Sequence, residues 1–275
     1  MNPAAKVMGW SLALLGAAVA PRLSAQETVA LRWALEDNQG SYCIWYLADP
    51  DLARQMVPTG TDLSPAGSGA GLPTLLARTI RDEPRFNLWI PGAICIGAYR
   101  RVTADGRTIA EAKEGRPIII ATSYLAAHDP HGVAGATSLL LAFMTDKRQV
   151  ARASESAGLD MSGISVVTRQ QVGADDPKVT ISVDGVEIVW TGHAIGDSGV
   201  GKTRSVSFGY ATNRSASWLI GLDSRPTSTR LMAGILEVEG RNTLARALKA
   251  SPVRGMGPEE SGGSVTLTFH KETRK

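Results

Sequence analysis

The sequence predicts a mainly β protein, with an antiparallel, bent or barrel-like sheet and three or four short helices. Apolar residues alternate with polar or small ones at a spacing of two, as Val29, Leu31, Trp33 and Leu35 do. Turn signals made of Gly, Pro, Asn and Asp separate these alternating segments. The regular succession of strand and helix that builds a parallel sheet does not occur, so we expect antiparallel pairing.

The first twenty-five residues predict a secretory signal peptide that precedes this fold. Lys6 supplies a positive charge, residues 7–20 are apolar, and Leu23-Ser24-Ala25 offers a small residue behind which signal peptidase can cut. The apolar run is shorter than a membrane-spanning helix requires. We therefore expect a secreted or periplasmic protein without a membrane span after cleavage, and a single β-rich domain over residues 26–275.

Strands are predicted in the first half for 29–35, 41–48, 87–102, 107–112 and 116–126. Pro91-Gly92 predicts an interruption of the third of these, because proline cannot donate to a strand ladder. Asp105-Gly106 is a typical hairpin turn between the third and the fourth. The apolar run 139–144 fits a strand or a helix equally well.

The helices are short and carry recognisable start signals. Asp49 as N-cap and Pro50 at the first helical position predict a helix that ends near Val57. The other predicted helices are 72–81, 145–157 (capped by Thr145 and closed by Gly158) and 242–250 (stopped by Pro252).

The second half gives the clearest strand pattern. Lys178 to Val183 and Val186 to Ile195 flank Asp184-Gly185, which predicts a β-hairpin. Further strands are predicted for 205–211, 217–222, 230–239 and 265–269.

Charge excludes one class of partner. The chain has 29 Lys and Arg and 26 Asp and Glu, and removal of the leader's Lys6 and Arg22 leaves a nearly neutral protein. Without a basic stripe, we expect no nucleic-acid partner. We also predict no cofactor.

The two cysteines, Cys43 and Cys95, both lie in apolar, strand-like runs. Export to an oxidising compartment favours a disulfide between them. Two buried free thiols remain the alternative, because the sequence does not report whether the Cα atoms come within bonding range.

Residues 196–203 match the phosphate-binding P-loop pattern in full. In a true P-loop, Gly196 and Gly201 let backbone N–H groups wrap the phosphates, Lys202 reaches the terminal phosphates, and Thr203 binds Mg²⁺. A helix must follow, yet residues 203–211 alternate like a strand. We therefore interpret the segment as a glycine-rich hairpin loop, with nucleotide binding as an alternative.

Two fragments around Ser198 and His128 are similar to the serine and histidine motifs of trypsin-like proteases. About seventy residues separate them, which is too few for the intervening barrel strands of such a protease. His128, Asp129 and His131 also form a small cluster to which His193 could add a metal ligand. Since Pro130 and Gly132 mark a turn, we predict no metal site.

One segment resembles a known family. Residues 44–58, Ile-Trp-Tyr-Leu-Ala-Asp-Pro-Asp-Leu-Ala-Arg-Gln-Met-Val-Pro, form a strand, a short helix and a proline, and resemble the entry segment of acetoacetate decarboxylase-like proteins. The resemblance covers about a fifteenth of the chain. It implies a strongly bent, many-stranded, barrel-like fold around an internal cavity.

The decarboxylases use a Schiff-base lysine whose pKa a neighbouring lysine lowers. The comparable region here, Ala151 to Leu159, contains no lysine, and the chain has no adjacent lysine pair. The resemblance therefore implies a cavity for a small organic molecule rather than this decarboxylation.

The sequence thus predicts an exported β-rich protein that binds a small organic molecule or a partner. An enzyme of altered chemistry on the same scaffold is the alternative. The candidate ligand-binding residues are Arg100, Glu155, His193 and Trp190. A catalytic cavity would bring the first three together, with a displaced pKa among them, while the tryptophan would line the cavity or pack in the core.

Overall fold

The computed structural model describes residues 29–68, 72–113, 115–129, 136–156, 167–171, 177–183, 186–211, 217–257 and 259–272. The predicted signal peptide lies outside these residues, as do His131, the 184–185 turn and Gly158.

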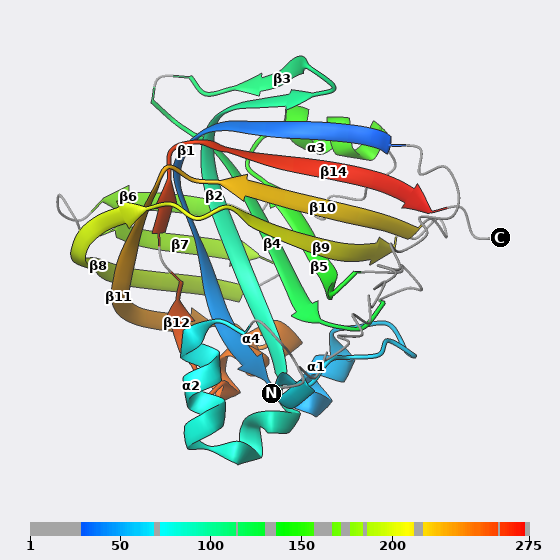
Figure 1. The fold of residues 1–275 in the computed structure, drawn as a ribbon, viewed down its shortest axis with the longest axis vertical. Coiled ribbons are helices and arrows are strands. Elements are labelled where there is room, and N and C mark those ends of the chain that lie inside the picture. The colour runs from blue at the N-terminus through cyan, green and yellow to red at the C-terminus, as the bar shows by residue number, and fades with distance from the viewer. Residues whose placement is uncertain are drawn as a thin grey trace, which may run out of the picture.

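The described residues form one large sheet with short helices around it (Figure 1). The helices are α1 (Pro50–Gln55), α2 (Thr74–Asp82), α3 (Arg148–Ser156) and α4 (Thr243–Ala250). The strands are β1 (Val29–Ala48), β2 (Ile90–Ala104), β3 (Arg107–Glu111), β4 (Ile118–Ala126), β5 (Ser138–Thr145), β6 (Val167–Gln171), β7 (Pro177–Val183), β8 (Val186–Val200), β9 (Arg204–Ala211), β10 (Ser217–Arg225), β11 (Ser228–Glu239), β12 (Arg254–Met256), β13 (Glu259–Ser261) and β14 (Ser264–Glu272). The predicted mainly β class is confirmed.

Part of the sheet closes on itself. Starting from β2, the pairing order is β4, β5, β9, β10, β14 and β1, and β1 pairs with β2 again. We call these seven strands the ring. From β1 the sheet continues through β13, β11, β8, β7 and β6, which we call the wing. Because the wing extends the sheet beyond the ring, the architecture is ring-like in part and is not a closed barrel.

The sheet is mixed rather than purely antiparallel. β5 and β9 pair in parallel at Ser138 with Phe208 and Leu139 with Gly209. The chain leaves the ring after β5, builds α3 and the wing strands β6 to β8, and returns to the ring at β9. A long excursion of this kind allows the parallel pairing that a short hairpin forbids.

A bend in β1 makes the ring and the wing possible. Asp37 has a positive φ of 54°, and the register with β2 shifts between Asn38 and Gly40. Before this bulge β1 pairs with β14, and after it β1 pairs with β13 and β12. A bulge bends a strand and increases its twist, so the same strand serves two parts of the sheet.

Two large cores share the walls of the ring. One lies on the inner side of the ring, around the buried Trp33, Phe143 and Phe269. The other packs the outer side of β1 and β2 against the wing and α4, and contains Ile44 and Trp190. β2 and β4 are consequently buried on both faces, which explains the continuous apolar run in β4.

Most predicted local signals have their expected structure. Asp49 Oδ1 accepts hydrogen bonds from the backbone N–H groups of Asp51 (2.9 Å) and Leu52 (3.4 Å) at the start of α1. Asp105 and Gly106 have positive φ values of 47° and 77°, as a tight hairpin turn requires. The undecided run 139–144 is a strand, within β5.

Several boundaries differ from the prediction, and the strands predicted for 29–35 and 41–48 form one continuous strand, β1. β2 runs through Pro91 and Gly92 without interruption, because Pro91 lies near the strand start and only β1 pairs with it there. Residues 87 and 88, with which the predicted strand began, instead end a 3-10 helix over Pro84–Leu88, and β2 starts at Ile90. The third helix begins at Arg148, since β5 occupies the chain up to Thr145.

None of the helices in the described ranges is long and apolar enough to cross a membrane.

Candidate functional site

A cavity of about 910 Å³ lies where the inner side of the ring meets the wing. Its wall combines aliphatic, aromatic and polar side chains, and five of the aromatic ones (Trp45, Tyr99, Tyr124, Phe143 and Phe208) come from five different strands. In β9 the alternating residues Arg204, Val206 and Phe208 line this space, and Ser205 borders it as well. The start of α2 and part of β11 border the cavity as well.

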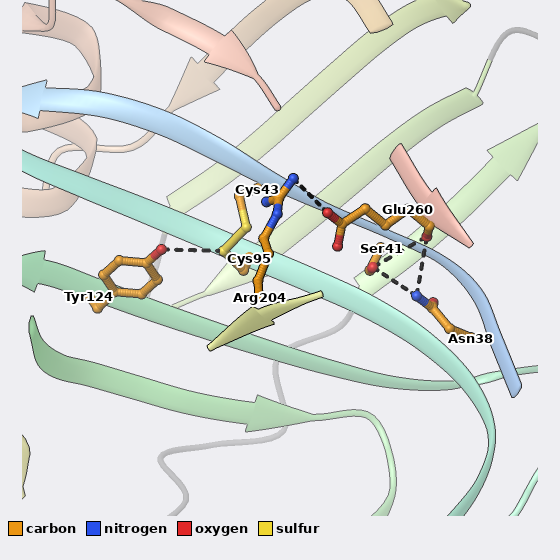
Figure 2. Close-up of a disulfide and its surroundings, with 7 residues drawn as sticks. All are labelled: Asn38, Ser41, Cys43, Cys95, Tyr124, Arg204 and Glu260. Carbon is orange, nitrogen blue, oxygen red and sulfur yellow. Dashed lines mark hydrogen bonds and ion pairs between the residues drawn. A yellow bond between two sulfur atoms is a disulfide. The ribbon is translucent and has the colours of Figure 1, made fainter. Parts of the chain in front are cut away.

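Among the described residues, three charged side chains line this cavity: Lys202, Arg204 and Glu260. Arg204 Nη2 lies 2.6 Å from Glu260 Oε1, which is a close ion pair (Figure 2). Glu260 is 8% exposed, whereas the Arg204 side chain is 42% exposed. Burial raises the pKa of the Glu260 carboxyl above its ordinary value, and Arg204 offsets part of this rise.

The β1 bulge holds the backbone of Glu260 in place. Asn38 Nδ2 donates to the Glu260 carbonyl oxygen (3.2 Å) and to Ser41 Oγ (2.9 Å), and Ser41 Oγ donates to the same carbonyl (3.3 Å), as Figure 2 shows. Asn38 Oδ1 in turn accepts from the Gly40 N–H (3.0 Å). The bend that lets β1 serve ring and wing therefore also positions the acidic residue of the cavity.

Neither Asn38 nor Glu260 is among the residues that the sequence predicted for the site. The segment Asn38-Gln39-Gly40 offered a signal, because asparagine and glycine inside an alternating strand indicate a bulge. Glu260 offered none, since its role depends on a contact with a residue more than two hundred positions away.

The Glu260→Gln variant is expected to become more stable than wild type as the pH rises from acidic to neutral, so that the difference in their free energies of unfolding grows with pH. A carboxyl whose pKa is raised in the folded state contributes stability below its unfolded pKa and loses that contribution as the pH rises through the folded pKa. Glutamine stays neutral, so the two proteins should converge at acidic pH. Urea midpoints across this range measure the difference.

The matched control for this variant is Glu239→Gln, which replaces an exposed carboxylate on β11. Its midpoint should differ from wild type by a small amount that does not grow between acidic and neutral pH. A Glu260→Gln protein that loses stability relative to wild type as the pH rises would contradict the raised pKa.

Cys43 and Cys95 form a disulfide, which decides between the two alternatives that the sequence left open. The residues face each other directly in the β1–β2 ladder, with Cα atoms 3.9 Å apart. Both line the cavity. The Tyr124 oxygen lies 3.8 Å from Cys95 Sγ (Figure 2), and the hydroxyl is the donor because a bonded sulfur carries no hydrogen.

The predicted ligand-binding residues do not come together around this cavity. Arg100 is exposed on β2 and forms an ion pair with Asp37 (3.2 Å). Glu155 and His193 are exposed on α3 and β8. Trp190 is 2% exposed and packs against Tyr42 in the outer core. None of the four is among the cavity-lining residues.

The P-loop-like segment has a strand after it. Residues 196–200 end β8, and Arg204–Ala211 form β9, so the described chain has no helix directly after Lys202. The predicted strand after Lys202 is confirmed, but the predicted hairpin is wrong, because β8 pairs in the wing and β9 pairs in the ring. Residues 201–203 instead cross from wing to ring, and this crossing carries Lys202 to the cavity.

His128 has a different partner from the one its motif indicated. Its Nε2 lies 3.1 Å from Ser64 Oγ, while Ser198 lies on β8. Within the described ranges, no group of three or more His, Cys, Asp or Glu residues could hold a metal ion.

Comparison with known proteins identifies the fold. No protein-family model matches the chain, and no curated protein matches it. Among solved structures, the chain is similar to the acetoacetate decarboxylase of Legionella pneumophila, with 11% identity over 88% of this chain and 87% of that one, and a TM-score of 0.50. A second acetoacetate decarboxylase structure has 11% identity over 87% of this chain and 88% of that one, and a TM-score of 0.48. The identity is low and the coverage is nearly complete, so the likeness is one of fold alone: the chain has an acetoacetate decarboxylase-like fold.

Proposed function

We propose that the protein is exported and binds a small organic molecule in the cavity between ring and wing. The observation that carries the proposal is the cavity of about 910 Å³, lined by aromatic and aliphatic side chains with a few polar groups among them. Pockets of about 300–1,000 Å³ with this kind of lining are typical of small-molecule sites.

Two features support export. The first residues have the charge, apolar run and small residues of a cleavable signal. The disulfide between Cys43 and Cys95 is a bond that persists in oxidising compartments and is rare in the cytoplasm. Detection of the processed chain outside the cytoplasm, with an N-terminus near residue 26, tests this part of the proposal.

Leu222→Trp is expected to weaken the binding of Nile red, a neutral apolar dye, by at least about tenfold, since a pocket contact is worth roughly 1–3 kcal/mol. Leu222 lines the cavity from β10 and is half-buried, so the larger indole would occupy the space that a ligand needs. Fluorescence titration of the exported protein measures the dissociation constant.

The control is Ile235→Trp, which adds the same ring to an exposed position that does not line the cavity. This variant should bind Nile red as wild type does. If both tryptophan variants bind the dye as wild type does, the proposed site is not where the ligand lies. Mass spectrometry of small molecules that co-purify with the protein would then identify the natural ligand class independently.

A second candidate function is an enzyme of altered chemistry on this scaffold. One observation favours it: the raised pKa of Glu260 is the kind of perturbation that catalytic acids show inside a cavity. The ion pair with Arg204 gives the same carboxyl a structural role, so we rank ligand binding first.

A further inference from the structure

We infer that the ligand is an amphipathic monoanion of the carboxylate class, with its charged group at Lys202 and Arg204 and its apolar body along the aromatic wall. The inference rests on the proposed function, because it names the chemistry of a ligand for the same cavity. It follows from the charges on the lining, the way Lys202 is held there, and the character of the remaining wall.

The charges of the described lining residues do not cancel. Lys202 and Arg204 are positive, and Glu260, when ionised, neutralises Arg204 at 2.6 Å. Lys202 forms no ion pair or hydrogen bond with another described residue. One positive charge is therefore left for a ligand, which favours an anion of single charge over a neutral or cationic molecule and over a doubly charged phosphate ester.

Lys202 is brought to the cavity by a constrained backbone. The Gly201 N–H donates to the Thr227 carbonyl oxygen (3.2 Å), and a Cβ at position 201 would collide with the Pro226 backbone. A glycine is thus required where the chain crosses from wing to ring, and the next residue is the lysine. The close approach to Pro226 accounts for Gly201 of the P-loop-like string without a nucleotide.

Arg204 can take part because its side chain is only partly buried. Its side chain is 42% exposed, so its guanidinium retains donors for a second acceptor while it pairs with Glu260. The guanidinium N–H groups that do not contact Glu260 can donate to a second carboxylate. Carboxylates suit this planar arrangement of donors because they accept two parallel hydrogen bonds from it.

The rest of the wall suits an apolar body. Trp45, Tyr124, Phe143 and Phe208 line the cavity beyond the charged groups. Burial of an alkyl or aryl group against such surfaces is favourable by roughly 25 cal/mol per Å². The site therefore combines one excess cation with a large apolar surface, which is the pattern that an alkyl or aryl carboxylate matches.

Titration with three molecules that share one tail tests the inference: octanoate, 1-octanol and octyltrimethylammonium. Wild type is expected to bind octanoate about tenfold more tightly than octanol, because a hydrogen bond between charged groups is stronger than one to a neutral hydroxyl. The cationic amphiphile should bind most weakly. Added salt should reduce the preference for octanoate because it screens the exposed lysine.

Lys202→Met removes the charge and keeps the apolar stem, so octanoate affinity should fall by about tenfold while octanol affinity stays unchanged. The control is Lys113→Met, which makes the same change at an exposed lysine away from the lining. This control variant should bind the three molecules in the same order of affinity as wild type does. Because Lys202 is exposed, its replacement leaves the core intact.

The possible outcomes separate the two proposals. If Leu222→Trp blocks Nile red but octanol binds as tightly as octanoate, or Lys202→Met keeps the preference, the anion inference is wrong and the cavity still binds ligands. If octanoate binds to wild type and to Leu222→Trp with equal affinity while Nile red is blocked, octanoate lies outside the cavity and the anion inference alone fails. If Nile red also binds Leu222→Trp as it binds wild type, both proposals fail.

Discussion

Replacement of Cys43 and Cys95 together by alanine is expected to lower the free energy of unfolding by about 4 kcal/mol. The two residues are 52 positions apart in the sequence, so their bond closes a long loop of the unfolded chain. In the chain-entropy account, a crosslink stabilises the folded protein by removing conformations from the unfolded one, and the effect grows with loop length. Because the residues already face each other in the β1–β2 ladder, the fold itself should persist without the bond.

Equilibrium unfolding in urea with and without dithiothreitol measures this effect. Wild type should move to the midpoint of the double alanine variant when it is reduced, and the variant should not respond to the reductant. Thiol titration of the denatured, unreduced wild type should find no free thiol, since the described chain has no free cysteine. A midpoint that dithiothreitol leaves unchanged, in a protein whose bond is shown to be reduced, would contradict the expected stabilisation.

The double alanine variant also tests whether the disulfide affects which ligand the cavity prefers. Cys43 and Cys95 line the cavity beside Tyr124 and do not contribute to its charge. Without urea, at a pH and temperature where the double alanine variant is folded, this variant should therefore still bind octanoate more tightly than octanol. We therefore expect stability and ligand selectivity to depend on different residues of the same wall.

The sequence predicted local structure well where a side chain acts within a few residues. Asp49 and Pro50 start α1 as expected, and Asp105-Gly106 turns the chain between β2 and β3. These signals depend on hydrogen bonds and backbone angles of neighbouring residues alone. Strand identity likewise follows from alternation, which is why most strands lie within a few residues of their predicted limits.

The ring and wing could not be predicted from the same patterns. They depend on the bulge at Asn38 to Gly40, after which β1 changes partners, and on the long excursion between β5 and β9. Alternation shows that a segment is a strand but not which strand it pairs with. The hairpin predicted for 196–203 failed for this reason, since β8 and β9 are consecutive in sequence and belong to different parts of the sheet.

Alternation was equally unable to predict which single residues line the cavity. Arg100 was a candidate and its neighbour Tyr99 lines the cavity, because adjacent residues of a strand point to opposite faces. β2 is buried on both faces over most of its length, so burial alone did not indicate which face meets a cavity. Lys202 was noticed for a nucleotide motif, and its place on the lining depends on the crossing from wing to ring.

Replacement of Trp190 by alanine is expected to lower the free energy of unfolding by about 4 kcal/mol, a large cost for one substitution. Trp190 is 2% exposed, and its ring centroid lies 6.4 Å from that of Tyr42. It also covers the paired glycines Gly192 and Gly234, where a Cβ would collide with the indole. The indole therefore fills the space that these glycines leave between the wing and the outer face of β1.

Trp190→Phe separates this packing role from a role in ligand binding. The smaller ring should retain part of the contact, so the loss should be about half that of the alanine variant. Since Trp190 does not line the cavity, the phenylalanine variant should bind octanoate with wild-type affinity under conditions where it is folded. Weakened octanoate binding with unchanged stability would instead mean that Trp190 contacts the ligand, as the sequence predicted. Urea unfolding and octanoate titration of the same preparation give the stability and the affinity. Lost stability with unchanged affinity indicates a residue that packs the wing against the ring, and unchanged stability with lost affinity indicates one that contacts the ligand.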